Sequence, residues 1–392
     1  MNKKCDTCKL VKIVYCTDTV CCPGGTQMIT MVKASALAEV NGFEVWIVVT
    51  DNKGKPIFPI SDKVHLVDLD VNYYEYDWKG TAYWLWSKVA KGRLHRKRLR
   101  ALLESVAPDY VISTGTSEKF FLPYLKVTSD PVYIREFHFD KWFRLRAATS
   151  FIAKMCAIFV NMYDYMWKIK SYDAIVVLTE EDKTLNWKGW KNVYVIPNPL
   201  TKQYTSVSTL KNKVVVAVGR LVPQKNLASL IRVWRKVADV HPDWILQIWG
   251  NGSLHDELEN QIVEQKLYGK VMLMGYADDV MEKMSRASVF ALSSSYEGFG
   301  LVIVEAMSVG VPVVSYACPA GPRDIIEDGA DGFLVKNGDE DTFADKICYL
   351  IEHEEERARM GKMALAKSKK YDVDIIVKKW VDFFNEMKMS EK

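Results

Sequence analysis

The sequence predicts an α/β protein built from two doubly wound halves, and three observations indicate this class. The chain opens with the order strand, glycine-bearing loop, helix, strand, in which residues 10–15 and 45–50 are the strands and residues 26–40 the helix. This order is typical of the start of a doubly wound parallel sheet. A second alternation of strands and helices begins at residue 214. With 392 residues, 49% of them hydrophobic, the chain also exceeds what one core usually supports.

The first half continues with short apolar runs rich in β-branched residues. These runs predict further strands at residues 108–113, 132–134 and 174–178. Residues 193–199 read Val-Tyr-Val-Ile-Pro-Asn-Pro. Because proline cannot continue a helix, we expect this segment to cross between the two halves.

The second half repeats the alternation and ends in an amphipathic segment. The predicted strands are residues 214–219, 244–250, 271–275, 289–293, 311–315 and 332–335, and the predicted helices are residues 226–240, 254–264 and 280–285. Residues 373–387 carry apolar side chains on one side of a further helix. We predict an N-terminal domain of residues 1–196, a second domain of residues 197–370, and a C-terminal helix, residues 371–392, that packs back across to the first domain.

Charge and hydropathy exclude two classes of protein. The net charge of +4 is mild, and because no RNA- or DNA-binding motif occurs we expect no nucleic acid partner. No apolar window reaches transmembrane length: the best candidate, residues 151–167, contains Lys154, Asn161 and Asp164. We find no secretory signal, and we expect a cytoplasmic protein.

Five of the eight cysteines precede residue 23. Cys5 and Cys8 have the spacing of half a zinc site, but no second pair follows at the spacing of a zinc finger or ribbon. Free thiols in a reducing compartment are the simpler interpretation, and a structural zinc is the alternative. We expect no metal cofactor.

The most informative segment runs from Glu297 to Glu305. Gly298 and Gly300 leave backbone N–H groups open to a close ligand, and the N-terminus of the apolar helix that follows favours an anion. The two glutamates accept hydrogen bonds and suit vicinal hydroxyl groups. A phosphate together with a polyol indicates a nucleotide sugar. The alternative for each glutamate is a helix-terminal charge worth only about 0.3–1 kcal/mol.

Residues 289–335 resemble the retaining glycosyltransferases of family 4, which have the GT-B fold of two Rossmann-like domains facing a cleft. Several motifs occur in the order of that family: Gly219-Arg220-Leu221-Val222-Pro223-Gln224-Lys225-Asn226, Gly275-Tyr276, Ser295-Tyr296-Glu297-Gly298-Phe299-Gly300, Glu305-Ala306 and Gly310-Val311-Pro312-Val313-Val314. The resemblance extends over most of the chain and is strongest in the second half. Within the family it is closest to bacterial capsule, exopolysaccharide and glycan-assembly members.

The resemblance implies that the second domain binds the nucleotide-sugar donor and the first domain faces the acceptor. Arg220 and Lys225 would hold the diphosphate, Glu305 the ribose, and Glu297 the hydroxyls of the donor sugar. The alternative for the two cations is that they are solvated loop residues. The implied donor-binding residues are Gly24, Gly25, Gly219, Arg220, Lys225, Gly298, Phe299, Gly300, Leu301 and Glu305.

In the first domain the sequence gives weaker support for the candidate site residues. Gly24 and Gly25 resemble the family's loop that faces the phosphates, although two glycines after a strand also make an ordinary turn. His138 follows a predicted strand, where the family often places a histidine near the reacting sugar. Its charged neighbours leave open the alternative that it only caps or packs in a loop. The implied catalytic residues are Glu297, His138, Arg220 and Lys225.

The implied reaction is transfer of a hexose or N-acetylhexosamine, with retention, to a glycan or to a polyprenyl-diphosphate-linked saccharide. A stretch from Cys318 to Ile326, common in such members, favours a UDP-linked donor. We expect metal-independent transfer, because cations at the diphosphate lower the barrier and Asp68-Leu69-Asp70 merely ends an alternating run in the first half.

The sequence features leave three alternative functions to compare with glycosyl transfer. One alternative is a non-catalytic nucleotide-sugar-binding partner subunit, and another is a nucleotide-sugar epimerase of the same fold. A dinucleotide-binding dehydrogenase needs a Gly-x-Gly-x-x-Gly turn, which neither half supplies.

Two stretches of the first half mix cations with aromatic residues. Residues 87–100 contain seven lysines and arginines and follow Trp78, Trp84 and Trp86, and residues 141–170 repeat the mixture. Such a surface can bind an anionic membrane. The alternative is an ordinary amphipathic helix whose cations are solvated.

Overall fold

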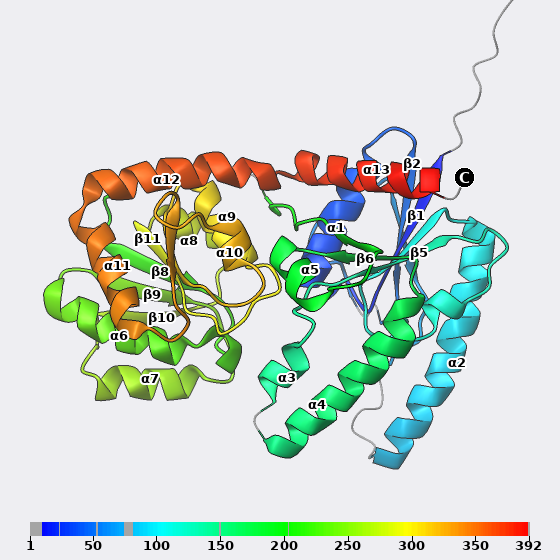
Figure 1. Ribbon diagram of the computed structural model, residues 1–392, viewed down its shortest axis with the longest axis horizontal. Helices are drawn as coiled ribbons and strands as arrows, with labels where there is room; N and C mark the ends of the chain where they lie inside the picture. Colours follow the sequence, from blue (N-terminus) through cyan, green and yellow to red (C-terminus); the bar gives the residue numbers. More distant parts are fainter. Residues whose placement is uncertain are drawn as a thin grey trace, which may run out of the picture.

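The computed structural model describes residues 10–22, 24–51, 54–73, 81–148, 150–202 and 204–390, without the side chains of residues 81–88 and 390. Cys5, Cys8 and Trp78, and the side chains of Trp84 and Trp86, lie outside the described part. Figure 1 shows two lobes side by side, each with a sheet covered by helices on both faces. The first lobe contains strands β1 to β7, and the second lobe contains strands β8 to β13.

The first sheet has seven parallel strands in the order β3-β2-β1-β4-β5-β6-β7. The strands are β1 Val11–Thr17, β2 Phe43–Val49, β3 Val64–Asp68, β4 Tyr110–Ser113, β5 Val132–Glu136, β6 Ala174–Val177 and β7 Val193–Val195. The helical elements of this lobe are α1 Gly25–Ala38, α2 Thr81–Val106, η1 Leu122–Tyr124, α3 Phe143–Ala147, α4 Phe151–Tyr163, η2 Asp164–Lys168, η3 Ile169–Ser171 and α5 Glu180–Asn186.

The second sheet has six parallel strands in the order β10-β9-β8-β11-β12-β13. The strands are β8 Val214–Val218, β9 Ile245–Trp249, β10 Val271–Gly275, β11 Val289–Leu292, β12 Val313–Tyr316 and β13 Gly332–Val335. The helical elements that follow β7 are η4 Pro223–Lys225, α6 Leu227–Val240, α7 His255–Glu264, α8 Val280–Ser285, α9 Leu301–Ser308, α10 Pro322–Ile325, α11 Glu340–Glu352, α12 Glu354–Ser368, η5 Lys369–Tyr371 and α13 Val373–Ser390. The two parallel sheets confirm the predicted α/β class.

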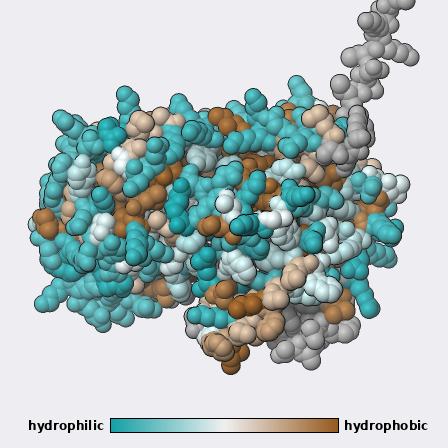
Figure 2. All heavy atoms as spheres, viewed as in Figure 1, coloured by the Kyte–Doolittle hydropathy of each residue, from teal (hydrophilic) through white to brown (hydrophobic). Residues whose placement is uncertain are grey.

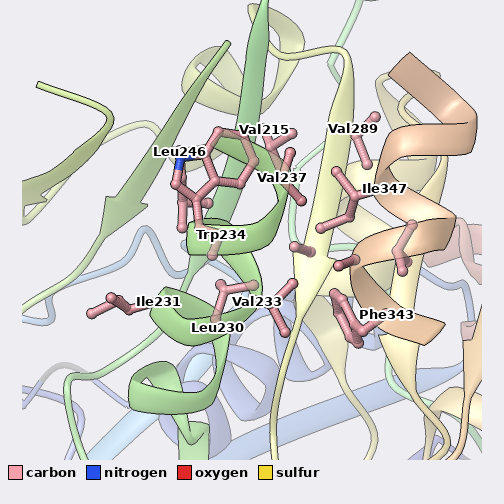
Figure 3. Packing of buried hydrophobic residues seen from close by; sticks show 14 of the residues in the cluster. Val215, Leu230, Ile231, Val233, Trp234, Val237, Leu246, Val289, Phe343 and Ile347 are labelled. Atoms are coloured by element: carbon pink, nitrogen blue, oxygen red, sulfur yellow. The ribbon is translucent and has the colours of Figure 1, made fainter. Parts of the chain in front are cut away.

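Each sheet is buried on both faces, as the continuous apolar runs of its strands require. In the second lobe, Trp234 of α6 and Phe343 and Ile347 of α11 are fully buried and pack on the strands from one face, as Figure 3 shows. All strands of a parallel sheet end at the same edge, so the loops that follow them gather there. This edge positions the candidate site.

The last helix joins the lobes. From α12 through η5 to α13 the chain runs along one side of the molecule from the second lobe to the first (Figure 1). In α13, Trp380 and Phe384 are buried in the core of the first lobe, and the Tyr110 hydroxyl donates a hydrogen bond to the Phe384 carbonyl oxygen at 2.6 Å. The predicted division at residues 196 and 197 stays a prediction; it falls between β7 and β8.

One expectation about secondary structure is wrong. Residues 193–195 do not cross between the halves but form β7, which pairs with β6. The Val-Tyr-Val alternation suits a half-buried edge strand, and the prolines at 197 and 199 act only after the strand has ended. Among the described helices, none has the length and apolar character needed to cross a membrane.

Candidate functional site

A glycine in the left-handed region starts helix α9. Gly300 has a φ of 87°, which a residue with a side chain rarely adopts, and the helix begins at Leu301. This turn leaves Glu297 just before the helix and Glu305 in its second turn. Phe299 is buried and Leu301 is half-buried in the core beneath the loop.

Lys225 and Glu297 form an ion pair. Lys225 ends the short turn η4 after β8, and its Nζ lies 2.7 Å from Glu297 Oε1, with both side chains largely buried. A Cβ on Gly219 would lie 3.1 Å from Lys225 Cε, so the glycine lets the lysine pass close to the backbone. The fold thus brings together three predicted residues, Gly219, Lys225 and Glu297.

Hydrogen bonds join the loops after β8 and β11. The Ser293 hydroxyl donates to the Lys225 carbonyl oxygen at 2.8 Å, and the Gln224 side-chain amide donates to the Tyr296 carbonyl oxygen at 2.9 Å. Arg220, at the end of β8, is exposed, and no ion pair to it occurs in the part of the chain that the structure describes. It is a free cation at the edge of the sheet beside the Lys225–Glu297 pair.

Glu305 is a buried carboxyl group with an unusual pKa. Burial raises the pKa of Glu305 to about 7, and the Lys225 ammonium opposes this rise. Over the described ranges its carboxylate has no hydrogen-bond or salt-bridge partner. Because the residue is only 8% exposed, water has little access to this carboxylate, and hydroxyl groups of a ligand would supply hydrogen bonds that no neighbouring side chain provides.

The glycine loop of the second lobe lies against the backbone of His138 in the first lobe. A Cβ on Gly298 would lie only 2.1 Å from the His138 carbonyl oxygen. Only a glycine permits this approach, because any side chain would push the lobes apart there. The structure thus places the His138 backbone next to the loop that carries Glu297, and a role for His138 near the reacting sugar stays a prediction.

His138 stands beside a buried ion pair. Lys33 of α1 and Glu136 at the end of β5 form a salt bridge inside the first lobe, and His138 Nε2 lies 3.3 Å from Glu136 Oε1. Burial is the main reason that the pKa of His138 falls to about 4; Glu136 opposes this and Lys33 and Arg135 add to it. His138 is therefore neutral at pH 7, with its ring nitrogens lacking good hydrogen bonds.

The sequence reasoning missed Lys33. It is fully buried, and its Nζ also lies 4.8 Å from the centroid of the Trp380 ring, which arrives from α13. Burial lowers the pKa of Lys33, and Glu136 opposes this. For Glu136, burial is the largest single influence and raises the pKa, but Lys33, His138 and Arg135 together outweigh it, so the net shift is downward. The sequence feature that could have indicated this buried residue is the position of Lys33 inside the apolar run of a predicted helix.

Gly24 and Gly25 lie at the start of α1, two turns before Lys33. Gly24 has an extended backbone and precedes the helix, whereas Gly25 has open space around the position that a Cβ would take, with no atom within 4 Å. As at any helix start, the first backbone N–H groups have no acceptor within the helix itself. No contact in the described residues joins these glycines to Glu297 or His138.

A second contact between the lobes was also missed. Asp324 of α10 accepts a hydrogen bond from the Glu180 backbone N–H at 3.0 Å and another from that of Glu181 at 3.3 Å, at the start of α5. Glu181 in turn accepts from the Ala320 N–H at 3.2 Å and pairs with Arg323. The segment from Cys318 to Ile326 thus contacts helix α5 of the first lobe, a role that its sequence did not indicate.

The Asp68–Asp70 sequence lies in another environment. Asp68 ends β3, and the backbone carbonyls of Leu69 and Asp70 each accept a hydrogen bond from Arg98 at 2.6 Å. Across the described part of the chain, no group of three or more His, Cys, Asp or Glu side chains is placed to hold a metal ion.

The second lobe is similar to a known protein family. Residues 203–367 match the model of the glycosyl transferases group 1 family. Over 360 residues the chain is 26% identical to an uncharacterised glycosyltransferase of Haemophilus influenzae, a match that covers 91% of this chain and 95% of that protein.

Two further relatives match over a shorter region. The chain is 36% identical over 222 residues to an exopolysaccharide phosphotransferase of Streptomyces coelicolor, covering 55% of this chain and 23% of that protein. It is 31% identical over 216 residues to the poly(ribitol-phosphate) alpha-N-acetylglucosaminyltransferase of Staphylococcus aureus, covering 54% of this chain and 44% of that protein. The chain thus spans less than half of the length of these two relatives.

Solved structures show the same fold. The TarM protein of Staphylococcus aureus, in complex with UDP and alpha-GlcNAc-glycerol, superposes with a TM-score of 0.76 at 17% identity, covering 96% of this chain and 100% of that one. HepE of Anabaena, in complex with UDP and glucose, gives a TM-score of 0.69 at 19% identity, covering 96% and 100%. These matches confirm the predicted GT-B fold. Together the findings support a glycosyltransferase, and residues 203–367, less than half of the chain, are similar to the group 1 glycosyl transferases.

Proposed function

We propose that the protein is a retaining glycosyltransferase that moves a hexose or N-acetylhexosamine from a UDP-sugar to a glycan or lipid-linked saccharide. The observation that carries the proposal is the arrangement around the glycine loop. The Lys225–Glu297 pair, the unpartnered Glu305 and the His138 backbone belong to two lobes, and the Glu297–Gly300 loop brings them to one edge.

Each group has a part in donor binding. Glu305 accepts hydrogen bonds from the ribose hydroxyls, which supply the donors that its buried carboxylate lacks. Glu297 accepts from hydroxyls of the donor sugar while it keeps Lys225 in place. The backbone N–H groups of Gly298 and Gly300 and the start of α9 face the diphosphate. The crystal structures of TarM and HepE, which share the fold, contain UDP, and this supports the choice of nucleotide.

Bond cleavage at the anomeric carbon leaves negative charge on the departing diphosphate. Arg220 and Lys225 stabilise this charge, so we propose that the transfer needs no metal ion. Removing one preorganised donor of this kind typically costs a factor of about 10²–10³ in kcat. His138, neutral at pH 7, acts by hydrogen bonding and not as a charged acid. The name of the Staphylococcus relative specifies an alpha product, which fits retention from an α-linked donor.

Thermal unfolding with nucleotides tests the donor site. We expect UDP at a hundredfold excess over Kd to stabilise the protein by about 2.7 kcal/mol, and GDP and ADP to stabilise it less. Glu305→Ala should weaken the shift, whereas Glu257→Ala, which removes an exposed carboxylate of α7, should leave it unchanged. Absence of a shift with any nucleotide would contradict the proposed donor site.

A transfer assay separates an enzyme from a binding subunit. We expect release of UDP from a UDP-hexose, faster with a saccharide acceptor, and an anomeric proton coupling that reports retention. Lys225→Ala should lower the rate about 10²–10³-fold. Binding of UDP without turnover would instead indicate the non-catalytic partner subunit, and conversion of the free UDP-sugar would indicate an epimerase. Loss of activity with a chelator, restored by manganese, would overturn metal independence.

A further inference from the structure

Helix α4 presents an apolar face to solvent. Phe151, Phe159 and Trp167 are 78%, 64% and 70% exposed, although large aromatic side chains are usually buried. The other exposed apolar residues of this segment are Ile152, Met155, Val160, Met162, Tyr163 and Met166. Figure 2 shows hydrophobic side chains gathered at the lower end of the first lobe, where Figure 1 places α3 and α4.

This apolar face lies opposite the face that packs on the protein. Residues 151, 155, 159, 162 and 166 recur every three or four positions and form one stripe. Ala157 and Asn161, on the other side of the helix, are buried. The stripe is therefore not part of the core, and an isolated monomer rarely leaves such a patch in water.

Cations surround the stripe without exposed acids. Lys154 and Lys170 are exposed and Lys168 is half-buried. The two acidic residues between positions 139 and 171 are Asp140 and Asp164, both buried and paired with arginines of α3, at 3.0 Å to Arg146 and 2.7 Å to Arg144. The charge that this segment shows to solvent is thus positive.

Helix α2 adds further cations beside α4. A hollow of about 520 Å³ lies between the two helices and is lined by Arg96 of α2 and by Tyr163 and Lys168. Arg93 and Lys97 are exposed on the same helix as Arg96. Within the described residues, no carboxylate pairs with Arg96, Lys97 or Lys168, so their charges remain available.

We propose that the α4 surface, meaning the apolar stripe from Phe151 to Trp167 with the cations of α2, α4 and residues 168–170, binds an anionic lipid bilayer. A 13-residue helix is too short to span a bilayer and instead lies in the interface, with its apolar side in the acyl region and its cations at the headgroups. A second copy of the chain is the less suitable occupant, because a symmetric contact would bring like charges together.

The surface shares no residue with the donor site proposed above, so the two proposals stand or fall separately. Binding through the α4 surface would place the bilayer next to the first lobe, which is the lobe proposed to face the acceptor. An acceptor anchored in the same bilayer would then reach the protein by diffusion in two dimensions.

Vesicle sedimentation tests the α4 surface. We expect the full-length protein to bind vesicles of phosphatidylglycerol and phosphatidylcholine at low salt, to bind pure phosphatidylcholine at least tenfold more weakly, and to be released as salt rises. Phe151→Ser/Phe159→Ser should reduce binding to the anionic vesicles about tenfold or more. The matched control Val263→Ser/Tyr268→Ser removes two similarly exposed apolar side chains from the second lobe and should bind like wild type.

Charge variants test the second half of the proposal. Lys154→Gln/Lys170→Gln should weaken binding about 25-fold, since each cation near an anionic surface contributes a factor of about five. Lys336→Gln/Lys362→Gln makes the same change in net charge on the second lobe and should have no effect. The thermal unfolding midpoint without ligand should be close to that of the wild type in all four variants, which shows that each is folded.

Two results would overturn the proposal. The first is wild-type protein that stays in the supernatant with anionic vesicles at low salt. The second is concentration-dependent dimerisation that the Phe151→Ser/Phe159→Ser variant abolishes, together with no vesicle binding, because a second copy would then be the occupant.

Discussion

Two buried titratable groups define the site at the scale of single residues, and their pKa values shift in opposite directions from their ordinary values. Burial raises the pKa of Glu305 to about 7 and lowers that of His138 to about 4. In both cases burial favours the neutral form. The site is therefore less charged than its sequence suggests, and its charged groups are the Lys225–Glu297 pair and the exposed Arg220.

Glu305→Gln should change how stability depends on pH. The folded wild type holds the Glu305 proton with a pKa of about 7, against 4.5 for an ordinary glutamate, so it binds more protons than the unfolded chain between these values. Its stability therefore falls as pH rises through this window, by about 2 kcal/mol between pH 5 and 8. The glutamine variant lacks this contribution, so it should gain stability relative to wild type as pH rises.

Urea unfolding of both proteins at pH 5 and pH 8 measures this difference. Glu257→Gln, on an exposed side of α7, is the control for removal of a carboxylate. Parallel curves for wild type and Glu305→Gln would show that Glu305 ionises normally.

At the scale of elements, close backbone approaches assemble the site. The loop before α9 passes so near to the segment after β5 that Gly298 has no room for a side chain. Gly321 has a φ of 142° and would place a Cβ 2.0 Å from the Phe299 carbonyl oxygen, so the segment before α10 packs on the same loop. Three segments distant in sequence thus meet at the Glu297–Gly300 loop.

Gly298→Ala tests this approach. The backbone of Gly298 is compatible with alanine, so the substitution acts through the contact with the His138 carbonyl oxygen and forces the loop or the lobe to move. A displacement of about 1 Å at a catalytic site can cost 10²-fold in rate, and we expect such a loss of transfer activity with little change in thermal midpoint. Gly92→Ala, in open space on α2, should keep full activity.

At the scale of the whole molecule, the two lobes touch through α5, α10 and the glycine loop, and α13 ties the chain's end to the first lobe. Asp324 caps the first N–H groups of α5 from the other lobe. The contact between α10 and α5 is polar, which is typical of lobes that move relative to one another around a ligand. The donor, bound between α9 and the first lobe, would then stabilise the closed arrangement.

Asp324→Ala should loosen this arrangement. It leaves two N–H groups of α5 without their acceptor and should cost about 0.5–2 kcal/mol, as loss of a helix cap does. We expect a larger radius of gyration in X-ray scattering, reduced again by UDP. Asp339→Ala removes a cap within the second lobe, on Thr342 N at 3.0 Å, and should cost similar stability without changing the scattering. Equal scattering from all three proteins would contradict a role for Asp324 between the lobes.

The sequence by itself determined the α/β class, most of the strands, and the Glu297 and Glu305 candidates, because alternating apolar runs and glycine-bearing loops are local signals. The resemblance to a family added Lys225. Tertiary structure alone decided which residues meet. Lys33 became the partner of Glu136, Gly298 met His138, and Asp324 reached α5, since these contacts join residues more than a hundred positions apart. It also decided that the apolar residues of α4 face solvent, because periodicity shows that a helix has an apolar side but not what covers it.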